Sequence, residues 1–290
     1  MSDALASGGI SGEACTDVST VVMTRERWSD LAGSLPRHTG PVILVDNGSR
    51  DDSVARVREH FPDVEVIALP ENRGASARNL GVAAARTPYV AFADDDSWWA
   101  PGALRRAAAL LDADPRLAVV AARVLVGSEE RLDPTCVAMA SSPLPATPAG
   151  PGVLGFVACG AVVRREAFTA VGGFDPVLGW PGEEELLALR LAAAGYSCAY
   201  ADDVVAHHHP STQRPPTLHR RALEERNDIL TALLTRPWPV VARTALARLG
   251  RGRDAGARLG LLWALARAPR ALRHRAPLPA EVERQRRLLD

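Results

Sequence analysis

The sequence contains no lysine, so all 34 of its basic residues are arginines. They are matched by 34 acidic residues, and a formal net charge of +0 argues against a general attraction to nucleic acid. The four cysteines lie far apart without a C-x-x-C pair, and the chain opens with no basic-then-apolar leader. No apolar run approaches the roughly 18 residues of a membrane span. We therefore expect reduced thiols and a cytoplasmic protein.

Strands and helices are predicted to alternate along most of the chain. Hydrophobic residues make up 47% of the 290 positions, enough for one large domain or two small ones. Apolar runs predict strands at residues 18–24, 41–45, 64–69, 89–93, 117–126, 155–163 and 197–206. Helices are expected at residues 28–34, 53–60, 72–85, 101–113, 164–171 and 182–194. This order predicts an α/β fold with a mostly parallel, doubly wound sheet flanked by helices. No G-x-G-x-x-G motif follows the first strand, which disfavours a dinucleotide-dependent oxidoreductase.

The stretch YVAFADDDSWW, residues 89–99, is the centre of the sequence pattern. Its apolar residues predict a short buried strand, and Asp94, Asp95 and Asp96 follow directly. Aspartates at the carboxyl edge of a sheet can share a hard divalent cation, and open α/β sheets bind ligands at this edge. The alternative is a solvated acidic turn that caps the helix beginning near Pro101.

Two later segments also depart from a simple strand and helix pattern. Residues 127–152 lose their periodicity, and we expect a surface excursion near a second substrate. The run at 172–175 is a tight Gly-Gly turn, and a helix opens shortly after it with three glutamates.

Seven motifs occur together in a fixed order: VVMTRER at 21–27, VDNGSRDDS at 45–53, ENRGASARNLG at 71–81, AFADDDSWW at 91–99, GAVVRREAFTAVGGFD at 160–175, PGEEELLALRLAAAGY at 181–196 and HHHP at 207–210. Over about residues 18–230 the chain resembles the family 2 inverting glycosyltransferases. The resemblance implies the Rossmann-like GT-A fold and sugar transfer from a nucleotide-diphosphate sugar to an acceptor hydroxyl, assisted by Mn²⁺ or Mg²⁺. Abundant Arg, Ala, Gly and Pro indicate a GC-rich bacterial genome of actinobacterial type.

On this resemblance the acidic triplet forms part of the donor site. Asp94 and Asp96 would contact the ribose and the metal ion, and Asp95 is able to replace either of them. His207 would complete the metal or diphosphate site, with His209 as the alternative. The three consecutive histidines cannot all bind one ion, because successive strand residues point to opposite faces.

Three further residues would line the nucleotide pocket by resemblance, namely Thr24, Asp46 and Arg78. The planar guanidinium of Arg78 also suits a phosphate. Plainer interpretations remain for each: a strand-end residue for Thr24, a turn former for Asp46 and a solvated helix charge for Arg78.

The acceptor side is expected around the glutamates that open the helix at 183. By resemblance Glu184 is the general base, where the family usually has aspartate, and Glu183 or Glu185 would be the alternatives. The resemblance also places Gly173, Asp175, Trp180 and Glu183 on the acceptor side. The acceptor would be a carbohydrate, a lipid-linked or a small molecule in cell-envelope or glycoconjugate biosynthesis. A sugar-phosphate nucleotidyltransferase and a catalytically silent glycan- or nucleotide-binding relative remain as alternatives.

The sequence divides into three expected parts. Residues 1–16 form a flexible tail, and residues 17–235 form the GT-A domain, with a donor half at about 17–126 and an acceptor half at about 153–235. Residues 236–290 form a helical extension with thirteen arginines and four acidic residues, a net charge of +9. Such a basic surface suits peripheral contact with anionic lipid on the inner face of the membrane. The alternative is an extension packed on the domain with solvated arginines.

Overall fold

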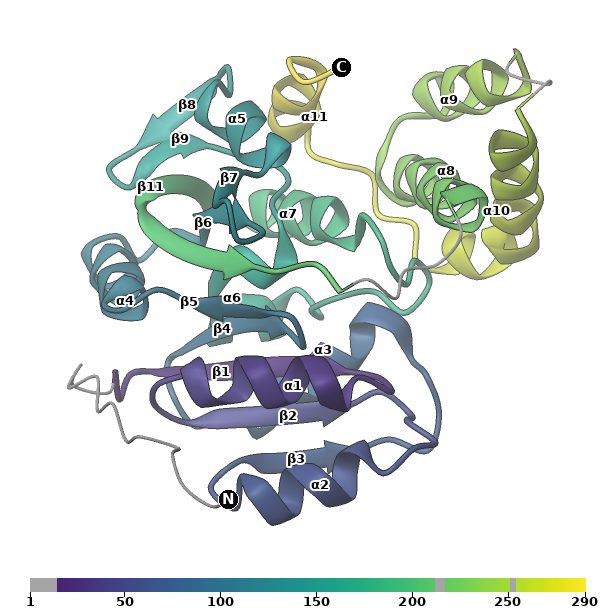
Figure 1. The fold of residues 1–290 in the computed structure, drawn as a ribbon. Helices are drawn as coiled ribbons and strands as arrows, with labels where there is room; N and C mark the ends of the chain where they lie inside the picture. The colour runs from purple at the N-terminus through teal and green to yellow at the C-terminus, as the bar shows by residue number, and fades with distance from the viewer. Residues whose placement is uncertain (1–14, 212–216, 251–253) are drawn as a thin grey trace, which may run out of the picture.

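The computed structural model describes residues 15–211, 217–250 and 254–290. The tail expected at residues 1–16 therefore lies almost entirely outside the described residues. Within them, eleven strands form one mixed sheet with helices packed on its faces (Figure 1). The α/β fold and the sheet flanked by helices are confirmed.

The first half of the sheet is parallel and ends in the acidic triplet. Strands β1 (Val18–Thr24), β2 (Val42–Asp46), β3 (Glu65–Ala68) and β4 (Tyr89–Asp94) lie in the order β3-β2-β1-β4. In the parallel registers Met23 pairs with Asp94, and Thr24 pairs with Asp46. The carboxyl ends of three strands therefore meet at one edge of the sheet, where ligands bind in open α/β folds.

The second half of the sheet is mixed. The short strand β10 (Ala161–Arg164) runs antiparallel between β4 and β6 (Leu117–Val126), and β11 (Ser197–His208) is parallel to β6. Four small strands complete it: β5 (Ser97–Trp99), β7 (Arg131–Leu132), β8 (Leu144–Thr147) and β9 (Gly150–Gly152). Residues 155–160, expected to be strand, instead form a loop and a 3-10 turn at Ala158–Gly160.

Both faces of the central strands are buried. Successive residues of β1 enter different cores, with Val21 packed among Phe92 and Phe174, and Val22 among Leu31 and Leu44. On one face lie α1 (Trp28–Ser34), α2 (Ser53–His60) and α4 (Ala103–Ala113). On the other lie α3 (Arg78–Ala84), α5 (Pro134–Ala140), α6 (Arg165–Ala170) and α7 (Glu183–Ala193).

Residues 127–152, expected to be an aperiodic surface excursion near a second substrate, contain short regular elements. They form β7, α5, β8 and β9, elements of two to seven residues that are too short to show a period in the sequence. Helix α5 begins at Pro134 after Asp133, whose carboxylate accepts a hydrogen bond from the Thr135 backbone N–H at 2.8 Å.

Four helices follow the sheet: α8 (Thr217–Thr235), α9 (Trp238–Gly250), α10 (Ala255–Arg273) and α11 (Ala280–Arg287). Figure 1 shows α8, α9 and α10 grouped beside the sheet, and α11 returning toward α7 and α5. Gly260 of α10 lies so close to α8 that an added Cβ would be 2.7 Å from the Ala222 carbonyl oxygen. Leu186 of α7, Leu230 of α8 and Ala264 of α10 share one hydrophobic core. A domain boundary at residue 235 stays a prediction. Helix α8 ends there and packs both on α7, which precedes the boundary, and on α9 and α10, which follow it.

Candidate active site

A cavity of about 1150 Å³ lies at the edge of the sheet where β1 and β4 end. One part of its wall comes from residues at or just after the ends of β1, β2 and β4: Thr24, Arg25, Arg27, Asn47, Asp94, Asp95 and Asp96. The rest comes from residues late in the chain, including Trp180, Glu184, His208, Arg220, Arg221, Glu224, Glu225 and Arg248. The cavity thus brings together the expected donor half and the expected acceptor half.

The three aspartates after β4 point to three different partners. Asp94 is bonded to the guanidinium of Arg78, and Asp95 accepts a hydrogen bond from the Thr24 hydroxyl at 3.0 Å. An oxygen of Asp96 lies 3.3 Å from His208 Nε2. Helix α4 begins after Gly102 without a side-chain cap, so the triplet is not the capping turn considered above.

The electrostatics of this turn suit a cation. Burial, together with the charges of Asp94 and Asp96, raises the pKa of Asp95 to about 7. Burial also acts on Asp96, but hydrogen bonds from His208 and from the Ser211 backbone N–H, the latter at 2.9 Å, hold its pKa below the ordinary value. The turn therefore concentrates negative charge around oxygen atoms that a divalent ion prefers.

The donor set fits a divalent ion held partly by substrate. Asp96 and His208 present an oxygen and a nitrogen beside each other, with Asp94 two residues away. Across residues 15–211, 217–250 and 254–290, no group of three or more His, Cys, Asp or Glu side chains is placed to hold a metal. Mg²⁺ is typically bound by one or two protein ligands together with substrate phosphates and water. Mn²⁺ accepts the same kind of oxygen donors.

Of the three consecutive histidines, the structure places His208, and not the expected His207, next to Asp96. Strand β11 extends to His208, so its alternation turns His208 toward Asp96 and His207 to the opposite face. The ring of His207 stacks on Trp98 with centroids 5.5 Å apart, and its Nδ1 lies 3.3 Å from Glu130. The alternative, His209, also packs on Trp98, at 4.7 Å. These two histidines support the strand that follows the aspartates instead of facing them.

Arg78 links the two halves of the site. Its side chain is buried, bonded to Asp94 and 3.5 Å from an oxygen of Glu183. Burial lowers the pKa of Arg78, but the charges of Asp94, Glu183 and Glu184 outweigh this and raise it. The solvated helix charge considered above is wrong, since the guanidinium is committed to two carboxylates.

Of the two other residues expected in the nucleotide pocket, Thr24 lies at the cavity and Asp46 does not. Thr24 lines the cavity and donates to Asp95. Asp46 is buried and accepts hydrogen bonds from the backbone N–H and the hydroxyl of Ser49, so it shapes the turn after β2. The next residue, Asn47, faces the cavity, and its side chain is fixed by the Gly74 carbonyl at 3.0 Å.

The glutamates at the start of α7 diverge. Glu183 is directed at Arg78, and the carboxylate of Glu184 lines the cavity and accepts a hydrogen bond from the Ala158 backbone N–H at 3.2 Å. Burial raises the pKa of Glu184, while this hydrogen bond and Arg78 lower it. A partly buried carboxylate with a raised pKa in a cavity is suited to proton transfer.

The turn before α7 supports the wall of the cavity. Trp180 lines the cavity with 37% of its surface exposed, and the guanidinium of Arg220 lies 5.6 Å from the centre of its ring. Gly173 and Asp175, expected on the acceptor side, lie behind this wall. Gly173 has φ +62° and packs against Asn79, while Asp175 is bonded to Arg190 at 2.5 Å.

Sequence reasoning missed the contribution of α8 and α9. Arg248 of α9 lines the cavity and pairs with Glu225 at 2.6 Å and with Asp228 at 2.8 Å, both on α8. In the sequence, α8 shows Arg220 and Glu224 four residues apart, a spacing typical of a solvated helix face. Only the folding of α8 over the sheet edge brings this charged face to the cavity.

Comparison with known proteins identifies the family of one domain of this chain. Residues 41–172 match the family model described as Glycosyl transferase family 2. Over 230 residues the chain is 32% identical to the pre-mycofactocin glycosyltransferase of Mycobacterium tuberculosis, covering 73% of this chain and 47% of that protein. The chain carries a glycosyltransferase family 2 domain. The succinoglycan biosynthesis protein ExoO of Rhizobium meliloti is 44% identical over 71 residues, covering 23% of this chain and 20% of that protein. The chain thus spans about half or less of the length of these curated relatives.

Solved structures share the fold of this glycosyltransferase domain. A mannosyltransferase of Pyrobaculum calidifontis in complex with GDP-Man and Mn²⁺ matches with a TM-score of 0.57 and 23% identity, covering 90% of this chain and 77% of that one. S. aureus TarS in complex with UDP-GlcNAc matches with a TM-score of 0.58 and 14% identity, covering 94% and 92%. The chain therefore has the GT-A fold. Among the described helices, none combines the length and the apolar character needed to cross a membrane.

Proposed function

We propose that this chain transfers a sugar from a nucleoside-diphosphate sugar to an acceptor hydroxyl with inversion, using Glu184 as the general base and a divalent cation at the donor. The observation that carries the proposal is the shared cavity. Glu184 and the three aspartates face the same space of about 1150 Å³ from different halves of the chain. A base and a donor site that line one cavity allow the acceptor hydroxyl to meet the donor and the base together.

The proposed reaction is a single displacement. The acceptor oxygen bonds to the anomeric carbon as the bond to the diphosphate breaks, and the acceptor proton passes to Glu184. The carboxylate is held for this by the Ala158 N–H, and Arg78 keeps the neighbouring Glu183 turned inward. Asp96 and His208, with Asp94 close by, would hold Mn²⁺ or Mg²⁺, which neutralises charge on the leaving diphosphate when it is bound.

The related proteins suggest which substrates to test. GDP-Man is bound in the mannosyltransferase structure and UDP-GlcNAc in the TarS structure. The curated relatives are named for pre-mycofactocin glycosylation and for succinoglycan biosynthesis. We therefore propose a GDP- or UDP-sugar donor and a carbohydrate, lipid-linked or small-molecule acceptor.

A donor screen tests the proposed function. We expect one nucleotide sugar to raise the melting temperature of the chain with Mn²⁺ or Mg²⁺ present, and the same compound to release its nucleoside diphosphate slowly to water. NMR coupling constants of the transferred sugar should show inversion at the anomeric carbon. A product that carries the nucleotide would instead support a nucleotidyltransferase, and binding without any product would support a silent relative. Mass spectrometry separates these outcomes.

The helices after residue 235 suit contact with an anionic membrane surface. On α9 and α10, Leu246, Leu262 and Leu265 are 64%, 62% and 60% exposed. Helix α10 contains four arginines and no acidic residue. Exposed leucines beside arginines match the two properties of an anionic bilayer surface, since each arginine near the headgroups adds about 1 kcal/mol.

Liposome binding tests this part of the proposal. The 290-residue chain should co-sediment with vesicles that contain anionic phosphatidylglycerol, and binding should weaken at high salt and with neutral vesicles. The double variant Leu262→Ser and Leu265→Ser should bind several-fold less. Leu288→Ser is the matched control, because Leu288 is equally exposed, at 60%, but lies after α11. Equal sedimentation of all three proteins would leave the helices with a structural role alone.

A further inference from the structure

The three glutamates at the start of α7 point in three different directions and have different surroundings. Glu183 is buried against Arg78, and Glu184 faces the cavity. The carboxylate of Glu185 points the other way, to the guanidinium of Arg286 on α11, with an Nε to Oε1 distance of 2.6 Å. Of these glutamates, Glu184 alone lines the cavity that holds the aspartates.

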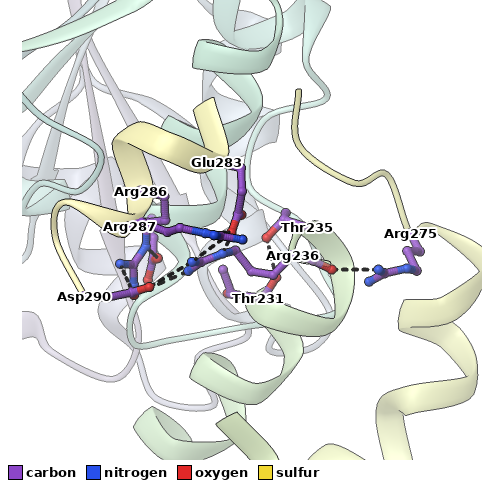
Figure 2. A network of polar contacts seen from close by, with 9 residues as sticks. Thr231, Thr235, Arg236, Arg275, Glu283, Arg286, Arg287 and Asp290 are labelled. Atoms are coloured by element: carbon purple, nitrogen blue, oxygen red, sulfur yellow. Dashed lines mark hydrogen bonds and ion pairs between the residues drawn. The ribbon is translucent and has the colours of Figure 1, made fainter. Parts of the chain in front are cut away.

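Arg286 is itself held in place by a network between α11 and the end of α8 (Figure 2). Its Nη1 donates to Asp290 at 2.7 Å, and the other oxygen of Asp290 accepts from Arg236 at 2.9 Å. Arg236 also donates to Glu283 at 2.7 Å, and both of these side chains are buried. Arg286 is therefore a fixed anchor for Glu185 and not a freely moving surface arginine.

Without this anchor, a second carboxylate would be free beside the proposed base. Glu185 follows Glu184 directly in the first turn of α7, and its side chain is long enough to take several directions. The groups that face Glu184 from the packed elements are Arg78 of α3, Asp94 of β4 and the Ala158 N–H. Arg78 already serves Asp94 and Glu183, so it is poorly placed to neutralise another carboxylate as well.

We propose that Arg286 is a positioning residue for the proposed base: by holding Glu185 against α11, it keeps Glu184 as the carboxylate that meets the acceptor. This rests on the proposed function, in which Glu184 takes the acceptor proton. The C-terminal helix α11 then belongs to the active site, although none of its residues lines the cavity described above.

A set of five variants tests this role: Arg286→Gln, Arg286→Lys, Glu185→Gln, the double variant Arg286→Gln with Glu185→Gln, and Arg284→Gln as control. Arg284 lies on the same helix, but its side chain is 73% exposed and pairs with Glu281. Activity is measured as release of nucleoside diphosphate from GDP-mannose or UDP-N-acetylglucosamine, whichever the wild type turns over faster, between pH 5 and 9.

Arg286→Gln is expected to lower kcat by about tenfold with an unchanged KM for the donor, because the base loses its orientation. On the acid side of the pH profile, the pH at which kcat falls should also move up by about half a unit. The reason is that an unpaired carboxylate nearby favours protonation of Glu184. Glu185→Gln should stay near wild type, and the double variant should recover most of the activity, since the free carboxylate is gone. Arg286→Lys, which keeps the charge, should keep most of the activity. Arg284→Gln should have no effect.

Two results would overturn the role of Arg286. One is an Arg286→Gln variant with wild-type kcat and an unmoved acid limb. The other is a Glu185→Gln variant as impaired as Arg286→Gln, with no recovery of activity in the double variant. That result would mean that the ion pair between Arg286 and Glu185 only stabilises the packing of α11 on α7. Glu184→Gln is assayed in parallel. If Glu184→Gln keeps its turnover, the base assignment fails, and the recovery pattern of the other variants still reports on Arg286.

Discussion

Replacing Glu184 by glutamine is expected to lower kcat by about 100-fold or more and to leave the affinity for the donor unchanged. Glutamine keeps the shape of the side chain and its contact with the Ala158 N–H region, but it cannot accept a proton at working pH. The donor half of the cavity is built from other residues, among them Thr24 and Asp96, and is untouched by the change. Steady-state kinetics and calorimetry with the donor separate the two effects.

The pH profile gives an independent check of the same assignment. The pKa of Glu184 is raised above its ordinary value by burial, so kcat of the wild type should fall as pH drops through this raised pKa. Glu184→Gln should lose this limb. Glu185→Gln is the matched control, because its side chain faces α11 at the neighbouring position. Near-normal turnover in Glu184→Gln would move the role of base to Glu183 or Glu185.

The sequence was sufficient for features that depend on local pattern. Strand β1 has the predicted bounds, and β4 extends one residue past the predicted 89–93, to Asp94, because a buried parallel strand is a short apolar run with polar residues at its end. The start of α7 was also found, since Gly182 followed by three acids is a typical helix beginning. These features place the aspartates at a sheet edge and Glu184 at a helix start without any knowledge of long-range contacts.

The sequence was insufficient where tertiary contacts decide. The predicted last strand ended at Ala206, but β11 continues to His208 because β5 and β6 pair with its final residues. Which face of β11 each histidine occupies depends on that pairing, whereas the expectation for His207 came from the family resemblance alone. The partners of Arg78 come from β4 and α7, and no spacing in the sequence indicates that its side chain is buried between them.

The largest expected effect on donor binding is that of Asp96→Ala. Asp96 adjoins His208 and is held by the Ser211 N–H, so its removal takes away one of two adjacent donors for a cation. We expect the affinity for GDP or UDP in the presence of Mn²⁺ to fall by about 100-fold, because the diphosphate loses its counter-charge. Affinity measured with a chelator should change little. Asp94→Ala should also weaken binding of the diphosphate. It removes one of the two carboxylates that pair with the buried Arg78 and leaves Glu183, so we also expect the protein to lose some stability.

The two histidines provide the matched comparison for this prediction. His208→Ala should weaken the Mn²⁺-dependent affinity by about tenfold, in the range seen when groups at a metal site are removed. His207→Ala changes the same residue type one position away, where the ring packs on Trp98, and should leave the affinity near that of the wild type. Calorimetry with and without Mn²⁺ measures all four variants. Unchanged affinity in both Asp94→Ala and Asp96→Ala would rule out the metal site at this turn, whereas a loss confined to His207→Ala would return the role to His207. Strand alternation argues for His208, because the face of β11 that carries it is the face that Asp96 approaches.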